Sequence, residues 1–143
     1  CMVQALIQLL KTKSLSNITI TELTERAGVS RMTYYRNYHS LDEIFSSYLK
    51  DLVEYQEGQV VSKTLVQNDY VSMTIFSFDK GEEISTHAAG GDAMVTVLEG
   101  KGRFTVGDEV FYVEEGETLI MPKDIPHAVY GEERFKMQLT VSF

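Results

Sequence analysis

The sequence contains a single cysteine, Cys1, so no disulfide bond can form within the chain. It has no apolar run near the roughly 18 residues that a membrane-spanning helix needs. Its first residues lack the basic segment and the cleavage site of a signal peptide. These absences predict a soluble cytoplasmic protein without a membrane partner. Because the chain begins at Cys1 rather than at Met, we expect the gene product to have further residues upstream.

The acidic residues are distributed unevenly along the chain. The formal net charge is −8, yet residues 1–55 carry six basic and six acidic side chains. Residues 56–143 carry seven basic and fifteen acidic side chains, and so hold the whole excess. A neutral first part remains compatible with binding to nucleic acid, whereas the acidic second part does not favour it.

Apolar residues in the first part repeat with the period of an α-helix. They recur at spacings of three and four from Met2 to Lys11. Thr19 and Glu22 predict a capping box at the start of a second helix, and Gly28 predicts its end. Ser30 can cap a short third helix, and residues 40–43 predict a second capping box, which opens a fourth helix to about residue 55. The first part is therefore predicted to be all-α.

The stretch ITITELTERAGVSRMTYYRNYHSLDEIF, residues 18–45, closely resembles the DNA-binding domain of the TetR family of transcriptional regulators. The resemblance implies a helix-turn-helix whose recognition helix enters the major groove of double-stranded DNA. It implies contacts to DNA from Thr19, Ser30, Arg31, Met32, Thr33, Tyr35 and Arg36. Tyr34 and Tyr38 are expected to pack instead. One departure is Leu41, since many members have a phosphate-binding lysine near this point.

Past Gly58 the period changes from helical to alternating. Short β-rich runs follow one another, separated by glycine or charged turns, as in a sandwich or barrel. We predict a boundary near residues 55–60 and two domains, 1–55 and 56–143. The predicted fold class is α+β, with an all-α helix-turn-helix bundle followed by an all-β barrel.

Two segments of the second part resemble the signature motifs of the cupin superfamily, which are double-stranded β-helix barrels. In GEEISTHAAGGDAMVTVLEG, Gly81, His87 and Gly100 match the first motif. Its second histidine and its glutamate are replaced by Ala89 and Ala93. In GETLIMPKDIPHAVYG, the matches to the second motif are Gly116, Pro122 and His127, while Asp124 stands at the middle glycine.

The cupin resemblance leaves the nature of the site open. Cupins bind a divalent metal through three imidazoles and a carboxylate, and this chain offers only His87 and His127. Asp92 is a candidate third ligand, and Met94, Tyr112 and Gln138 are candidates for lining the same cavity. Alternatively the two histidines bind a small molecule without metal, or are buried core residues. Two imidazoles beside two alanines favour the metal-free reading, so no cofactor is predicted, with a metal at His87 and His127 as the alternative.

These observations predict a transcriptional regulator that binds DNA through its helices and uses its cupin domain to sense a small ligand and to form a homodimer. The alternative is a small-molecule-binding cupin or a metal-dependent cupin enzyme, in which the helical segment serves only for interaction. The sequence shows no nucleophile with a positioned base, so no catalytic residue is predicted.

Overall fold

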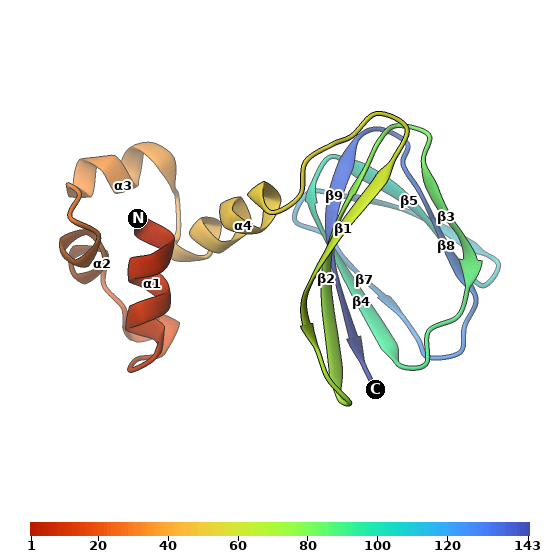
Figure 1. Ribbon diagram of the computed structural model, residues 1–143, viewed down its shortest axis with the longest axis horizontal. Coiled ribbons are helices and arrows are strands. Elements are labelled where there is room, and N and C mark those ends of the chain that lie inside the picture. Colours follow the sequence, from red (N-terminus) through yellow and green to blue (C-terminus); the bar gives the residue numbers. More distant parts are fainter. The chain divides into compact units, whose positions relative to one another are not determined.

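The computed structural model describes all of residues 1–143 and divides into two compact units. The helical unit comprises Cys1–Tyr48, and the β unit comprises Leu49–Phe143. The division falls within helix α4, Leu41–Asp51 (Figure 1). Residues 49–55 therefore lie in the β unit.

The helical unit packs around one hydrophobic cluster. Its elements before α4 are α1 (Met2–Leu10), a 3₁₀ turn (Leu15–Asn17), α2 (Ile20–Ala27) and α3 (Arg31–Asn37). The buried members of the cluster are Ala5, Leu6, Leu9, Ile18, Leu23, Tyr34 and Ile44. The period seen in the sequence reflects this packing, because residues three and four apart share one face of a helix.

The ends of α2 and α3 follow the predicted capping chemistry. The Glu22 N–H donates to Thr19 Oγ1 over 3.1 Å, and the Thr19 N–H donates to the Glu22 carboxylate over 3.3 Å. Gly28 ends α2 with φ of 70°, in the left-handed region that glycine reaches without strain. The Thr33 N–H donates to Ser30 Oγ over 3.2 Å. These three predictions are confirmed.

The start and the end of α4 differ from the prediction. The Glu43 carboxylate accepts from the N–H of His39 over 2.9 Å, one residue before the predicted partner, Ser40. The helix ends at Asp51 rather than near residue 55. Directly after Asp51, Val53 is buried with Ile75 and Leu98 of the sheet, and the chain leaves the helix to make this contact.

The β unit contains two antiparallel sheets that face each other in Figure 1. The five-stranded sheet has the order β1-β2-β9-β4-β7, and the four-stranded sheet has the order β3-β8-β5-β6. The strands are β1 (Val60–Gln67), β2 (Val71–Phe78), β3 (Glu83–His87), β4 (Asp92–Glu99), β5 (Lys101–Val106), β6 (Glu109–Glu114), β7 (Thr118–Met121), β8 (His127–Tyr130) and β9 (Phe135–Ser142). This is a β-sandwich of the kind that cupins have.

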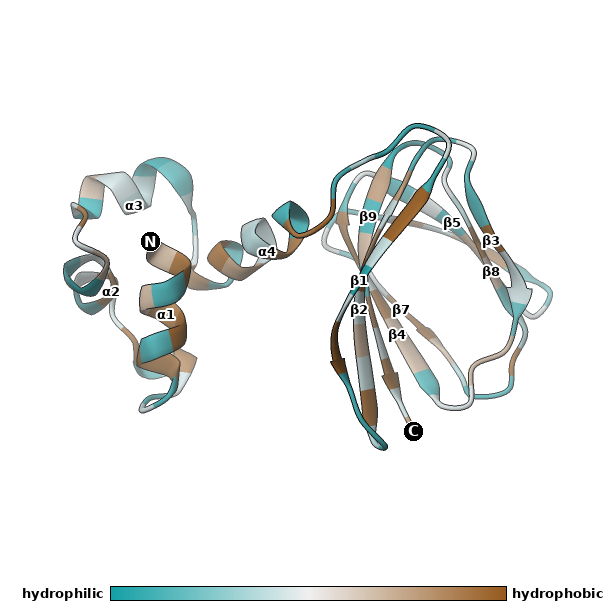
Figure 2. Ribbon diagram, viewed as in Figure 1, coloured by the Kyte–Doolittle hydropathy of each residue, from teal (hydrophilic) through white to brown (hydrophobic).

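The core of the β unit lies between the two sheets. Phe78 and Phe135 stack with ring centroids 4.6 Å apart, and Phe104 meets Phe135 edge to face at 6.1 Å. All three side chains are fully buried. Brown, hydrophobic residues recur along the strands in Figure 2. The alternation of hydrophobic residues in the sequence therefore arises because one face of each strand is turned toward this core.

The segment after Tyr48 packs against the outside of the five-stranded sheet, within the β unit. Val53, Ile75 and Leu98 form a separate buried cluster, and Leu49 and Leu52 pack against it. The Ser77 hydroxyl donates to the Glu54 carbonyl over 2.8 Å. The Tyr55 hydroxyl donates to Glu99 over 2.6 Å, and burial together with this carboxylate raises the pKa of Tyr55. These contacts fix residues 49–55 on the barrel.

None of the helices is both long enough and apolar enough to cross a membrane.

Candidate functional site

His87 and His127 lie side by side at one end of the four-stranded sheet. They are register partners across the antiparallel pair β3–β8. Directly opposite residues in such a pair project to the same face of the sheet. Their ring centroids are 4.4 Å apart, with an interplanar angle of 68°. The structure therefore brings together the two histidines that the cupin motifs single out.

Both imidazoles are held by the backbone in the same way. The Nδ1 atom of His87 lies 2.9 Å from the Ser85 carbonyl oxygen, and that of His127 lies 3.0 Å from the Ile125 carbonyl oxygen. A carbonyl oxygen can only accept, so in each ring Nδ1 carries the proton and donates it. The neutral ring then presents Nε2 as a hydrogen-bond acceptor or a metal ligand. The site thus offers two oriented imidazole acceptors.

The two histidines differ in exposure. His127 is 3% exposed, whereas His87 is exposed to solvent. Burial lowers the pKa of His127, the proximity of His87 lowers it further, and the bond to the Ile125 carbonyl opposes this. The buried ring therefore stays neutral to lower pH than a free histidine. One histidine of the pair is therefore buried in the barrel, and the other is accessible to solvent.

The loop before His127 needs an unusual backbone conformation. Asp124 stands where the second cupin motif has glycine, and it is the one non-glycine residue with positive φ, 63°. Its N–H donates to the carbonyl of Ala89 over 3.2 Å. Aspartate tolerates this left-handed conformation better than most side chains. The bond ties the second motif to the first, next to the histidine pair.

The donor set does not fit the metal centre that cupins usually have. No three His, Cys, Asp or Glu side chains lie close enough together to hold a metal ion. Ala89 and Ala93 stand at the remaining ligand positions, and Ala93 is only 1% exposed, in the barrel core. Divalent metals of this type take four to six ligands. Two imidazoles alone supply half or less of that number.

Four residues predicted near the histidines lie elsewhere. On β4, Ala93 and Val95 are buried in the core, so Asp92 and Met94 project from the opposite, outer face. The Asp92 carboxylate accepts from the Lys123 N–H over 2.9 Å. Tyr112 and Gln138 alternate with core residues in the same way and also face outward. The structure does not bring these four side chains to His127, because the sequence alone did not fix the strand register.

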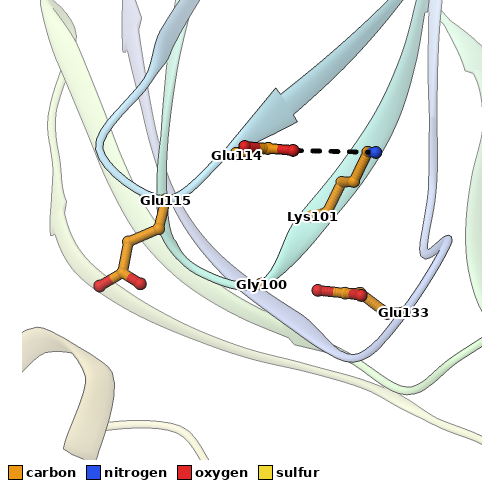
Figure 3. A pocket seen from close by; sticks show the side chains of 5 residues that line it. All are labelled: Gly100, Lys101, Glu114, Glu115 and Glu133. Carbon is orange, nitrogen blue, oxygen red and sulfur yellow. Dashed lines mark ion pairs between the residues drawn. The ribbon is translucent and has the colours of Figure 1, made fainter.

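An open pocket lies at the other end of the four-stranded sheet. It has a volume of about 540 Å³ and is lined by Gly100, Lys101, Glu114, Glu115 and Glu133 (Figure 3). Lys101 pairs with Glu114 over 3.8 Å. Strand β5 begins at Lys101 and ends at Val106, which pairs with His127. The pocket is therefore a full strand length from the histidines, and its solvated carboxylates provide no enclosed site.

In the helical unit, α3 presents most of the predicted contact residues to solvent. Met32 is 69% exposed and Tyr35 is 55% exposed, whereas Tyr34 is 1% exposed. Arg31 and Arg36 are exposed, and Thr33 is half-buried. Tyr34 and Tyr38 belong to the core cluster, as predicted. The helix therefore has one polar and aromatic face toward solvent and one face that anchors it.

Two predicted contact residues have structural roles at helix starts. Thr19 takes part in the capping box of α2. Ser30 Oγ caps α3 and lies 3.0 Å from the Thr33 hydroxyl. The carbonyls of Ser85 and Ile125, which orient the histidines, were not predicted. Every residue has a carbonyl, so only the fixed position two residues before each histidine could have indicated them.

Residues 74–143 match the family model of the cupin domain. A conserved protein of unknown function from Streptococcus pyogenes is 46% identical, with a TM-score of 0.64, over 66% of this chain and 82% of that chain. A cupin 2 conserved barrel domain protein from Leptotrichia buccalis is 48% identical, with a TM-score of 0.65, over 66% of this chain and 46% of that chain.

A cupin superfamily protein from Desulfitobacterium hafniense is 33% identical, with a TM-score of 0.63, over 65% of this chain and 85% of that chain. No curated protein matches the chain. The family match begins at Thr74 and leaves the helices outside it, so the TetR resemblance stays a prediction. The chain belongs to the cupin superfamily, because it has the double-sheet barrel, the motif histidines and these relatives.

Proposed function

We propose that this protein is a small-molecule-binding cupin whose ligand contacts the Nε2 atoms of His87 and His127. The observation that carries the proposal is the pairing of two imidazoles, both oriented by backbone carbonyls, at the end of the barrel. A histidine that only fills a core needs no such matched partner. Two fixed acceptors can recognise one ligand group from two sides.

The protonation state of the pair selects the ligand chemistry. With Nδ1–H donated to a carbonyl, each neutral ring accepts at Nε2. The ligand is therefore a small organic molecule that presents hydroxyl or N–H donors. A metal held by the same two atoms is the competing occupant, and the alanines at the other two positions argue against it.

Histidine NMR tests the site directly, because the chain has only three histidines and His39 lies in the helical unit. We expect long-range ¹H–¹⁵N spectra to show the Nδ1–H tautomer for His87 and His127. Hydroxylated and amino compounds from a metabolite panel should shift these two rings and leave His39 unchanged. An Nε2–H tautomer in either barrel histidine, or shifts confined to His39, would contradict the proposal.

Metal binding is separated from ligand binding by restoring the family pattern. The double variant Ala89→His, Ala93→Glu restores donors at the two motif positions that alanine occupies in this chain. Calorimetric titration with Ni²⁺ should give at least about a tenfold tighter site in this variant than in the native chain. Equal and tight binding by the native chain, lost in His127→Ala, would favour a metal-dependent cupin instead.

A second function, DNA binding by residues 1–55, is supported by the exposure pattern of α3. Met32, Tyr35 and the two arginines lie on the solvent side, while Tyr34 anchors the opposite side. A helix that reads base edges needs such an exposed polar face on a fixed support. In this proposal the helices bind DNA, residues 56–143 bind the ligand, and the protein is a transcriptional regulator.

Fluorescence anisotropy with labelled DNA from upstream of its own gene tests this function. We expect specific binding that resists unlabelled competitor, and a loss of about 1–3 kcal/mol in Arg31→Ala if Arg31 reads a base. Lys11→Ala is the matched control, since Lys11 is an exposed cation of the same unit outside α3. Identical binding of the native chain and of both variants would contradict DNA recognition by α3.

A further inference from the structure

The β7–β8 turn, residues 122–126, carries the carbonyl that orients His127. The Ile125 N–H donates to the Pro122 carbonyl over 3.2 Å, which closes a four-residue turn. Asp124 is the third residue of this turn and has φ of 63°. A positive φ at that position is typical of type II turns, in which glycine or asparagine usually stands. Aspartate is less favourable there than glycine, so the β7–β8 turn needs support from the surrounding structure.

Three hydrogen bonds from neighbouring segments provide this support. The Asp124 N–H donates to the Ala89 carbonyl over 3.2 Å, and a backbone N–H of the β5–β6 turn donates to the Pro126 carbonyl over 2.7 Å. The third bond is donated by the Lys123 N–H to the Asp92 carboxylate over 2.9 Å. Only this third bond uses a side chain, so it alone depends directly on the identity of one residue.

The position of Asp92 in the first cupin motif places its carboxylate for this contact. Asp92 opens β4, directly before the buried Ala93, so its side chain projects from the outer face of the sheet. It forms no ion pair within the chain. A carboxylate that accepts from a backbone N–H makes a charge-assisted hydrogen bond, which is stronger than a bond between neutral groups. The backbone of the β7–β8 turn is therefore the partner of this carboxylate.

The two histidines depend on different segments for their orientation. His87 donates from Nδ1 to the carbonyl of Ser85, which lies in the same strand, β3. His127 donates from Nδ1 to the carbonyl of Ile125, which lies in the β7–β8 turn. A shift of this turn would move the Ile125 carbonyl and leave the Ser85 carbonyl in place. Loss of the turn's support should therefore affect only one ring of the pair.

We propose that Asp92 is a positioning residue of the ligand site. Its carboxylate holds the Lys123 N–H and with it the β7–β8 turn. The turn fixes the Ile125 carbonyl, and this carbonyl keeps the His127 proton on Nδ1. Nε2 of His127 is thereby left as the acceptor that contacts the ligand. This inference rests on the proposed function for what Nε2 binds, while the state of the ring can be measured without a ligand.

Long-range ¹H–¹⁵N spectra of the ligand-free full chain, recorded where the rings are neutral, test this role. In Asp92→Ala, the ratio of the Nδ1–H to the Nε2–H tautomer of His127 should fall at least about threefold, which matches the lower end of the net free energy of one hydrogen bond. The ratio for His87 should not change. Asp92→Asn keeps an acceptor oxygen and should preserve both native ratios. So should the matched control Asp69→Ala, which removes an exposed carboxylate from the β1–β2 turn.

The proposal is wrong if His127 keeps its native tautomer ratio in Asp92→Ala, if both rings change equally, or if Asp92→Asn behaves like Asp92→Ala. Exchange of the Lys123 amide proton with solvent is a second measurement that needs no variant. It should be slower in the native chain than in an unfolded peptide, and exchange at the unfolded rate would show that the bond to Asp92 is absent. The native tautomers test the ligand proposal, whereas only the differences between variants and this exchange rate test Asp92, so the two failures are distinguishable.

Discussion

Replacing Tyr34 with alanine is expected to unfold the helical unit. The Tyr34 ring is 1% exposed and packs 5.3 Å from Tyr35 and 5.9 Å from Tyr38, measured between ring centroids. Removing a buried aromatic side chain costs about 3–5 kcal/mol, including the cavity that it leaves. The 48 residues of this unit, at about 0.05–0.15 kcal/mol each, have a total stability of roughly 2–7 kcal/mol. The loss is therefore comparable to the whole stability of the unit.

Urea titrations followed by far-ultraviolet circular dichroism measure this loss, and ¹H–¹⁵N spectra assign it to the helices. Tyr34→Phe keeps the ring and should stay within about 1 kcal/mol of the native chain. Tyr35→Ala removes an exposed ring, so its change in stability should be about 0.5 kcal/mol or less. A Tyr34→Ala chain with native helical signal and native urea midpoint would refute the assignment of Tyr34 as the anchor of α3.

Three further predictions concern stability. Gly102→Ala would place a Cβ 2.8 Å from ring atoms of Phe135, so it should lower the free energy of unfolding by about 1–3 kcal/mol. Gly90→Ala is the control, because the space around its Cβ is open. Equal urea midpoints for the two variants would contradict this packing. Thr19→Ala removes the cap of α2 and should cost about 1 kcal/mol in a thermal melt, and no change would mean that the cap contributes nothing. Because burial lowers the pKa of His127, the unfolded state binds more protons below about pH 6.5. The free energy of unfolding should therefore fall as the pH drops through this value, until the folded pKa is passed, and His127→Gln should flatten that dependence.

The alternating pattern that indicated β-structure in the sequence is absent from β3. In Glu83–His87 only Ile84 is hydrophobic, so the segment lacks the alternation by which the other strands were found. The helix caps at Thr19, Gly28 and Ser30 were predictable because their chemistry is local. The order of the two units, helices first and a cupin-like β-sandwich second, was predictable from the change in hydrophobic period along the chain.

The composition of the site was only partly predictable. The cupin motifs identified His87 and His127 but could not show which β4 residues share their face. A shift of one residue in register exchanges the two faces of a strand, and Asp92 and Met94 lie on the outer one. Met94, which was predicted to line the ligand cavity, is instead 40% exposed on that outer face. Long-range strand pairing, which the sequence does not state, decides which face such a residue occupies.

The salt dependence of DNA binding tests the proposed contacts of α3 with phosphate. The acidic excess lies in residues 56–143, so we expect such contacts from exposed cations of the helical unit, chiefly Arg31 and Arg36. Each phosphate neutralised contributes about −0.9 to the slope of log K against log salt concentration, so these two arginines together should contribute about −2 per copy. Arg36→Ala should therefore reduce the magnitude of the slope by about 1 per copy. A slope that does not change in this variant would contradict a phosphate contact from Arg36.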